Sequence, residues 1–191
     1  IEGREPSCDF KHASELVEFI KQFDSKTGGN QFKVFGACYP EQHPESEDVM
    51  SDIQGLKAKV DAGATHLISQ LFFDNEKFYR FLERAKLAGI TVPIEAGIMP
   101  ATNKKSIERM VSLTNATLPP KFINMMERYG DSPEAIRDAG IAYAVDQIVD
   151  LVTNGVDGIH LYTMNNSYIA KRINEAVRSL FTVAPKDFVI K

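Results

Sequence analysis

Aromatic and polar side chains are concentrated in the run ACYPEQHPES, residues 37–46, which follows a short apolar stretch. Prolines fix their own φ and restrict the residue before them, so this run predicts a stiff loop. Such a loop would hold Tyr39 and His43 against a planar ligand. In the alternative interpretation, Tyr39 covers the core and His43 is a surface turn residue. The spacing alone does not separate the two.

Three further candidates share one face of the helix expected over EDVMSDIQGLKAKVDAG, residues 47–63. The spacing of Asp52, Gly55 and Lys59 aligns them beside the apolar stripe of that helix. A lysine there could bind a phosphate, and an aspartate could accept a hydrogen bond from a ribose hydroxyl. A solvated helix face is the simpler explanation of the same residue types.

A lone amide, Gln70, interrupts the apolar run ISQLFFD, residues 68–74, where we expect a buried strand. Burying a polar group without a partner costs about 1–3 kcal/mol, so Gln70 needs one in the protein or in a ligand. Its amide offers both a donor and an acceptor, which suits a heterocycle such as a pterin. Gly97 would permit a close approach of backbone or ligand, and Tyr162 is expected at the same mouth.

The elements that position these residues follow a fourfold pattern: an amphipathic stretch, a glycine, then a short apolar run. Glycine adopts the left-handed conformation at a helix end without steric cost. The helices are expected over 13–29, 47–63, 75–89 and 132–155, ending at Gly29, Gly63, Gly89 and Gly155. The strands are expected within 32–40, 65–73, 91–100 and 158–164.

Helices that alternate with buried strands predict an α/β fold with a parallel sheet. The rhythm breaks over residues 100–131, which we interpret as a helical insertion containing a helix, the breaker Pro119-Pro120 and a second helix. The insertion follows the third strand, at the end of the sheet where parallel α/β folds place their binding loops. Residues 1–191 otherwise predict one domain.

Composition excludes several classes of protein. With 191 residues, 43% hydrophobic and 25% charged, the chain can form a core and is not intrinsically disordered. It lacks an apolar run long enough for a membrane span and an apolar leader, so we expect a cytoplasmic protein. A pI of about 5.6 without a basic cluster argues against nucleic-acid binding. The four histidines lack metal-ligand spacing, so no metal site is expected.

The runs ACYPEQHPES, KAKVDAGATHLISQLFFD, PIEAGIMP and HLYTMN occur in this order between Phe32 and Ser179, and together they resemble the methylenetetrahydrofolate reductase family. The resemblance implies a parallel (β/α)8 TIM barrel that carries FAD. Family members transfer a hydride from NADH or NADPH to the flavin. The reduced flavin then converts 5,10-methylenetetrahydrofolate to 5-methyltetrahydrofolate, a step of one-carbon and methionine metabolism.

The resemblance also assigns roles to the candidate residues. Tyr39, His43 and Ser46 would lie in the flavin part of the site. The ribose and phosphate portions of FAD would be held by the helix face that carries Asp52, Gly55 and Lys59.

The folate end of the site departs from the family pattern more than the flavin end does. Gln70 would contact the pterin ring. Asn166 stands where the family usually has an arginine that meets the folate glutamate, and Ser106 stands where some relatives have a glutamine. On the helix, Gly55 replaces a frequent asparagine and Ala58 a frequent basic residue. These changes weaken the expectation of tight folate binding.

The four expected strands match the C-terminal half of the family barrel, which typically needs about 250 residues. The family's proton-donating glutamate belongs to the other half, so no catalytic residue is assigned in this chain. We therefore expect pairing with a complementary half-barrel or self-association. The alternative function is a non-catalytic module that binds flavin, folate or a protein partner. Residues 1–10 are interpreted as a linker or an engineered scar, because Ile1–Arg4 spells a protease site.

Overall fold

The computed structural model describes residues 9–29, 32–114 and 116–183. The expectation for Ile1–Arg4 therefore lies outside the described residues. In the described part of the chain, four strands form one parallel sheet in the order β1-β2-β3-β4. The strands are β1 (Phe35–Cys38), β2 (His66–Ser69), β3 (Ile94–Ile98) and β4 (Gly158–Leu161). The predicted α/β class and parallel sheet are confirmed.

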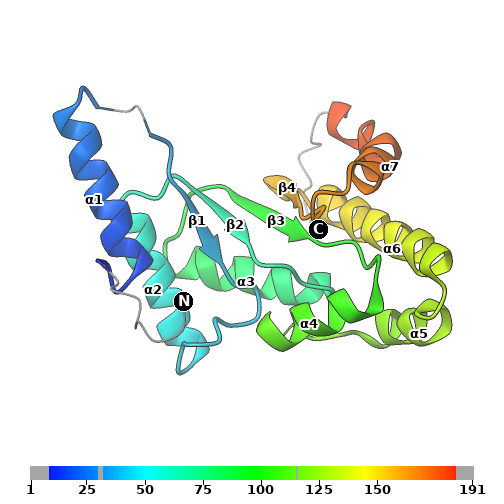
Figure 1. The fold of residues 1–191 in the computed structure, drawn as a ribbon. Coiled ribbons are helices and arrows are strands. Elements are labelled where there is room, and N and C mark those ends of the chain that lie inside the picture. Colours follow the sequence, from blue (N-terminus) through cyan, green and yellow to red (C-terminus); the bar gives the residue numbers. More distant parts are fainter. Residues whose placement is uncertain (1–8, 30–31, 115, 184–191) are drawn as a thin grey trace, which may run out of the picture.

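Helices cover one face of this sheet (Figure 1). The described helices are α1 (Ala13–Lys26), α2 (Val49–Asp61), α3 (Asn75–Leu87), α4 (Lys104–Thr114), α5 (Pro120–Tyr129), α6 (Pro133–Thr153) and α7 (Ser167–Val177), followed by the short 3-10 helix η1 (Leu180–Thr182). Of these, α2, α3, α6 and α7 pack against the sheet, α1 packs on α2, and α4 and α5 lie at the carboxyl end of the strands. The helices α4 and α5 occupy the predicted insertion. Within the described ranges, no helix has the length and apolar character needed to cross a bilayer.

Local sequence explains where the helices that carry the site begin and end. Asp48 caps α2 by accepting a hydrogen bond from the Ser51 N–H, and the Ser51 hydroxyl in turn accepts one from the Asp48 N–H. Ser132 caps α6, and Pro133 is its first residue, both as predicted. The four glycines predicted at helix ends all have positive φ. The most extreme is Gly63 at +117°, which an L-residue rarely adopts.

The hydrophobic core consists of two clusters. The main cluster packs the sheet, through residues such as Leu67 and Ala96, against α2, α3, α6 and α7. A second cluster gathers around Phe73 and Phe122 beneath the insertion, and includes Met99 at the end of β3. The insertion therefore has a packing centre of its own at the carboxyl end of the sheet.

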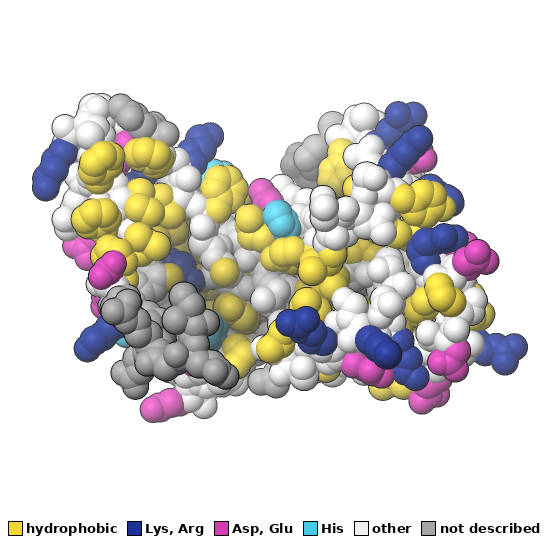
Figure 2. Space-filling view, viewed as in Figure 1, with side chains coloured by type: hydrophobic (Ala, Val, Ile, Leu, Met, Phe, Trp, Pro, Cys, Tyr) yellow, Lys and Arg dark blue, Asp and Glu magenta, His cyan; other side chains and the backbone are white. Residues whose placement is uncertain are grey.

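The opposite face of the sheet is open. Phe35 on this face is 48% exposed and stacks on the half-exposed His66, with ring centroids 4.6 Å apart. Among the described strands, β1 and β4 each pair on one side only. Leu16, Phe19 and Phe23 are also exposed along one face of α1. Figure 2 shows hydrophobic side chains over α1 and in the hollow between α1 and the α7 region.

Candidate functional site

All six residues predicted to bind a cofactor line one cavity of about 540 Å³ at the carboxyl end of β1. They are Tyr39, His43, Ser46, Asp52, Gly55 and Lys59. The opposite wall of the cavity is formed by residues 11–14 at the start of α1. Sequence reasoning missed that wall, because the segment carries no pattern beyond an amphipathic helix start. The structure thus brings the loop and helix candidates together, while their ligand stays a prediction.

Within the loop of residues 39–46, side chains bond to the backbone of the same loop. Gln42 Nε2 donates to the Ser46 carbonyl at 2.7 Å. His43 Nδ1 accepts from the Glu45 N–H at 3.1 Å, so a neutral His43 carries its proton on Nε2. The rings of Tyr39 and His43 meet edge to face, with centroids 4.4 Å apart. Both rings border the cavity, so the loop presents a fixed aromatic wall.

Asp52 fastens this loop to α2. Its Oδ2 accepts a hydrogen bond from the His43 N–H at 3.1 Å, and its Oδ1 accepts one from the Ser46 hydroxyl at 3.4 Å. The sequence suggested that Asp52 would accept from a ribose hydroxyl. In the structure its two oxygens already have protein partners, so its evident task is to position the loop. Each carboxylate oxygen can still accept a second hydrogen bond.

Lys59 is turned toward the end of β1 and is half-buried. Its Nζ donates to the Ala37 carbonyl at 2.6 Å. Burial lowers the pKa of Lys59, and the nearby Cys38 opposes this shift. The stem of Lys59 crosses Gly36, where an added Cβ would come within 2.8 Å of Lys59 Cδ. The interpretation of this helix face as simply solvated therefore does not fit Lys59. It does fit Gly55 and Ala58, which are exposed.

Cys38 lies beneath the cavity, on the face of β1 packed against α2. It is 2% exposed, and burial raises the pKa of its thiol to about 12. The thiolate is the nucleophilic form of cysteine, so Cys38 is unreactive at neutral pH. We assign it to the core.

Gln70 lies one residue beyond β2, so the prediction that it sits inside the strand is wrong. The ladder between β2 and β3 stops early because the Gly97 N–H donates to the Ser69 hydroxyl, at 2.8 Å, rather than to a backbone carbonyl. Gln70 is half-buried, and its Oε1 accepts from the Leu71 N–H at 3.0 Å. Its predicted need for a partner is met on the acceptor side. Among the described residues, its Nε2 makes no hydrogen bond.

The buried Ser69, which sequence reasoning did not single out, connects β2 with β3 and β4. Its carbonyl accepts from the Tyr162 hydroxyl at 3.0 Å. The Tyr162 ring can reach across because residue 97 is glycine. An added Cβ there would lie 2.1 Å from the Ser69 carbonyl and 2.8 Å from the ring. The prediction for Gly97 is a close approach of backbone or ligand, and the groups that approach it are the Ser69 carbonyl and the Tyr162 ring.

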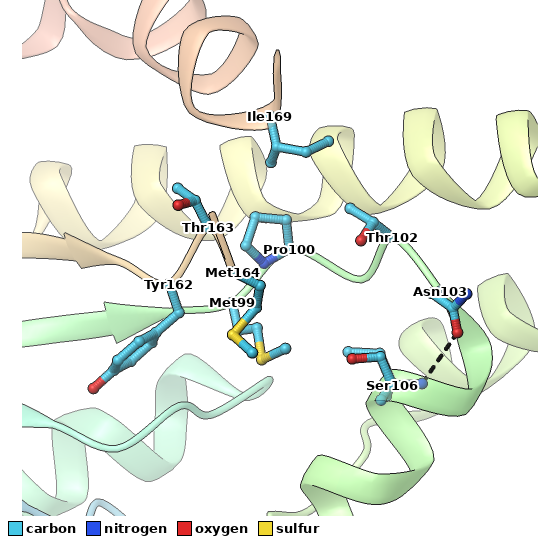
Figure 3. Close-up of a pocket in the computed structure, with 10 residues that line it drawn as sticks. Met99, Pro100, Thr102, Asn103, Ser106, Tyr162, Thr163, Met164 and Ile169 are labelled. Carbon is cyan, nitrogen blue, oxygen red and sulfur yellow. Dashed lines mark hydrogen bonds between the residues drawn. The ribbon is translucent and has the colours of Figure 1, made fainter. Parts of the chain in front are cut away.

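A second, smaller cavity of about 80 Å³ opens where β3, β4 and α4 meet. Figure 3 shows Met99 and Met164 side by side in it, with Ser106 and Asn103 facing them. Asn103 Oδ1 accepts from the Ser106 N–H at 3.1 Å and so begins α4. The sequence placed Ser106 in the folate end of the site, and the structure places it on this cavity.

Asn166 does not line the smaller cavity. Its Oδ1 accepts from the Ile169 N–H at 3.2 Å and caps α7. Two residues just before it, Met164 and Asn165, have φ of 50° and 61°, an arrangement that is uncommon outside glycine. Such backbone strain tends to persist at functional sites. Met164 of this turn also lines the smaller cavity.

The fold and the site define a class: a parallel βα protein of barrel type, with its cavities at the carboxyl ends of the strands. Comparison with known proteins gives the family. The methylenetetrahydrofolate reductase family model matches residues 2–178, so the chain belongs to this family.

The chain is 34% identical over 172 residues to the 5,10-methylenetetrahydrofolate reductase of Pectobacterium carotovorum subsp. carotovorum, covering 90% of this chain and 55% of that protein. It is 36% identical over 162 residues to the Escherichia coli (strain K12) protein of the same name, covering 85% and 53%. The chain therefore spans about half the length of these curated relatives.

A solved structure shares the fold at 18% sequence identity, with a TM-score of 0.59 over 89% of this chain and 59% of that one. It is an uncharacterized protein from Clostridium thermocellum that binds two copies of 5-methyl-5,6,7,8-tetrahydrofolic acid.

Proposed function

We propose that this chain forms the cofactor-binding half of an FAD-dependent methylenetetrahydrofolate reductase. The observation that carries the proposal is that the loop candidates and the helix candidates, six residues together, line the same 540 Å³ cavity beside β1. Family membership supports the reaction, in which NADH or NADPH reduces a flavin that in turn reduces 5,10-methylenetetrahydrofolate. One relative, from Arabidopsis thaliana, is named for NADH. The nucleotide used by this chain is left to assay.

The residues of the larger cavity fit FAD chemically. Lys59 places an ammonium group at the end of β1, where it would neutralise a phosphate. Tyr39 and His43 offer aromatic surface, and the Nε2–H of neutral His43 is a donor for a ring carbonyl or nitrogen. When bound, FAD supplies the hydride chemistry; the protein binds and orients it. Asp52 serves this binding by fixing the loop.

The folate ligand belongs to the other side of the mouth. Gln70 keeps an amide donor there, and the smaller cavity beside Ser106 lies across the strand ends. The solved structure that shares this fold binds a methylated tetrahydrofolate. We assign the pterin to Gln70, and the cavity of Ser106 to the part of the folate beyond the pterin. Among the residues that the structure describes, no cationic side chain lines this cavity, so the charged contact that the family usually makes from position 166 is missing here.

The open face of the sheet requires a partner. An exposed inner face and two unpaired strand edges resemble a barrel opened along its axis. Both free edges belong to parallel strands, so four more parallel strands would close an eight-stranded barrel.

The helices favour a complementary half-barrel over a second copy of this chain. One helix, α1, precedes β1, and another, α7, follows β4. Two copies would bring α7 of one and α1 of the other to the same gap between adjoining strands. A partner of four strands and three helices, beginning and ending in a strand, avoids this collision.

A non-catalytic module is the alternative function, favoured by Asn166, whose side chain is used to cap α7. A turnover assay distinguishes the two. The protein, reconstituted with FAD, is given NADH or NADPH and an artificial electron acceptor. Reduction of the acceptor supports the reductase, whereas bound flavin without reduction supports the module. Failure to bind FAD would contradict both flavin proposals.

A further inference from the structure

The carboxylate of Glu41 joins two segments that lie far apart in the chain. Glu41 lies in the loop of residues 39–46, and its Oε1 accepts from the Thr117 N–H at 2.8 Å. Its Oε2 accepts a second, short hydrogen bond from the Thr117 hydroxyl. The two residues are 76 positions apart in the chain. A single side chain thus links the loop after β1 to the segment between α4 and α5.

On one side of this link, the loop forms a wall of the larger cavity. Its other attachments run to different helices: Asp52 of α2 holds the His43 N–H, and Arg84 of α3 donates from Nη2 to the Pro40 carbonyl at 3.1 Å. Both attachments hold the loop to elements of the main hydrophobic cluster. Only the Glu41 link, among the described contacts of this loop, reaches the insertion.

On the other side, Thr117 follows Ala116, which is 5% exposed and belongs to the second hydrophobic cluster. That cluster includes Ile107 of α4, which also lines the smaller cavity. A shift of the segment around Thr117 would therefore be transmitted through packed side chains to the wall of the smaller cavity.

We propose that Glu41 is a positioning residue that couples the two cavities, so that a ligand in one changes the affinity for a ligand in the other. The inference rests on the proposed function, which places flavin in the larger cavity, the pterin at Gln70 and the rest of the folate at the smaller cavity. Two acceptor oxygens facing two donors of one residue fix both the distance and the orientation of the insertion. Coupling then arises because each ligand binds with different affinity to the arrangement with the Glu41–Thr117 bonds and to the arrangement without them.

The exposed position of the link suits this role. Thr117 is exposed and Glu41 is half-buried, so water competes for the same hydrogen bonds and the link opens at modest cost. A buried link would hold the insertion in a single position. An exposed one allows ligand contacts of ordinary strength to shift the balance between the two arrangements.

Hydrogen–deuterium exchange of the ligand-free chain tests the link. Glu41→Ala is expected to raise exchange about fivefold in segment 116–123 and in the loop, because local opening becomes easier. Thr117→Val, which removes only the hydroxyl donor, should give a smaller rise. It should add nothing further in the Glu41→Ala background. Glu45→Gln is the matched control: it removes one charge from the same loop without a bond to Thr117, and exchange in 116–123 should not change.

FAD titrations with and without 5-methyltetrahydrofolate test the coupling. In the unaltered chain the folate compound should change the Kd for FAD about fivefold, within the usual range of coupling between sites. In Glu41→Ala the folate effect should fall to less than half, and what remains is the direct contact between pterin and flavin that the proposed reaction requires. Glu41→Gln should retain part of the effect, because its Oε1 can still accept from the Thr117 N–H.

Two outcomes would overturn the proposal separately. Unchanged exchange in Glu41→Ala, or a folate effect as large as that of the unaltered chain, would overturn the role of Glu41 while FAD binding stood. Absence of FAD binding to the unaltered chain would overturn the proposed function, and the coupling with it. The exchange data would still report whether the link exists.

Discussion

Lys59 is the residue on which the cofactor assignment depends most directly. Its ammonium group is held at the end of β1 by the Ala37 carbonyl and faces the larger cavity. A charge-assisted hydrogen bond to a phosphate contributes about 1.5–3 kcal/mol. Lys59→Ala should therefore weaken FAD binding about ten- to a hundredfold in a fluorescence titration. Lys57→Ala is a suitable control, because Lys57 pairs with Asp61 away from the cavity.

The lowered pKa of Lys59 predicts a pH dependence. Burial lowers this pKa, so Lys59 loses its charge at a lower pH than an exposed lysine does. FAD affinity should fall as the pH rises through the lowered pKa, and Lys59→Arg, which stays charged, should flatten the fall. The unfolded chain keeps this proton to a higher pH than the folded protein does. The free energy of unfolding should therefore increase as the pH rises from the lowered pKa toward 10.5. Equal pH profiles for the two proteins would contradict the phosphate role.

Cys38 gives a second prediction at the scale of the residue. Because burial raises the pKa of its thiol to about 12, Cys38 should resist iodoacetamide at pH 8 in the folded protein and react after unfolding. The thiol of the unfolded chain ionises first, near its usual pKa of 9.0. The stability that Cys38 contributes is therefore complete below pH 9 and is lost as the pH rises from 9 toward 12. Peptide mapping of the labelled protein checks this, and rapid native labelling of Cys38 would contradict its burial.

At the scale of the element, two helical glycines form a matched pair. An added Cβ at Gly140 in α6 would lie 1.8 Å from the Ala101 carbonyl, whereas one at Gly55 in α2 has no atom within 4 Å. Gly140→Ala should destabilise the protein by about 1–3 kcal/mol, because α6 must move off the segment after β3. Gly55→Ala should stabilise it by about 0.5–1 kcal/mol through helix propensity. Urea denaturation compares them, and equal effects would contradict the close packing of α6.

Much of the fold at this scale could be predicted from the sequence, because helix period, caps and glycine stops are local signals. Ser132, Pro133 and Gly155 marked real helix ends. The partners of polar side chains could not be predicted in the same way. The spacing of Asp52 placed it on the cavity, but its bond to the His43 N–H depends on the path of a loop nine residues away. The early stop of the β2–β3 ladder likewise accompanies a contact between Ser69 and Gly97, 28 residues on.

At the scale of the whole molecule, the open face of the sheet predicts association. Light scattering coupled to size exclusion should show the chain alone as a mixture of oligomers rather than a defined dimer, because α1 and α7 of two copies would collide. It should show a one-to-one complex when mixed with a complementary segment of four strands and three helices. Phe19→Glu, at a position 55% exposed on α1, should reduce association, because a buried charge is costly. A well-behaved monomer that ignores the complementary segment would contradict the half-barrel.

The central claim is that the cavity beside β1 holds FAD, and a titration of FAD into the purified chain tests it most directly. We predict a saturable quench of flavin fluorescence that Lys59→Ala weakens by at least about tenfold. No saturable binding, or binding of equal strength in Lys59→Ala, would contradict the claim.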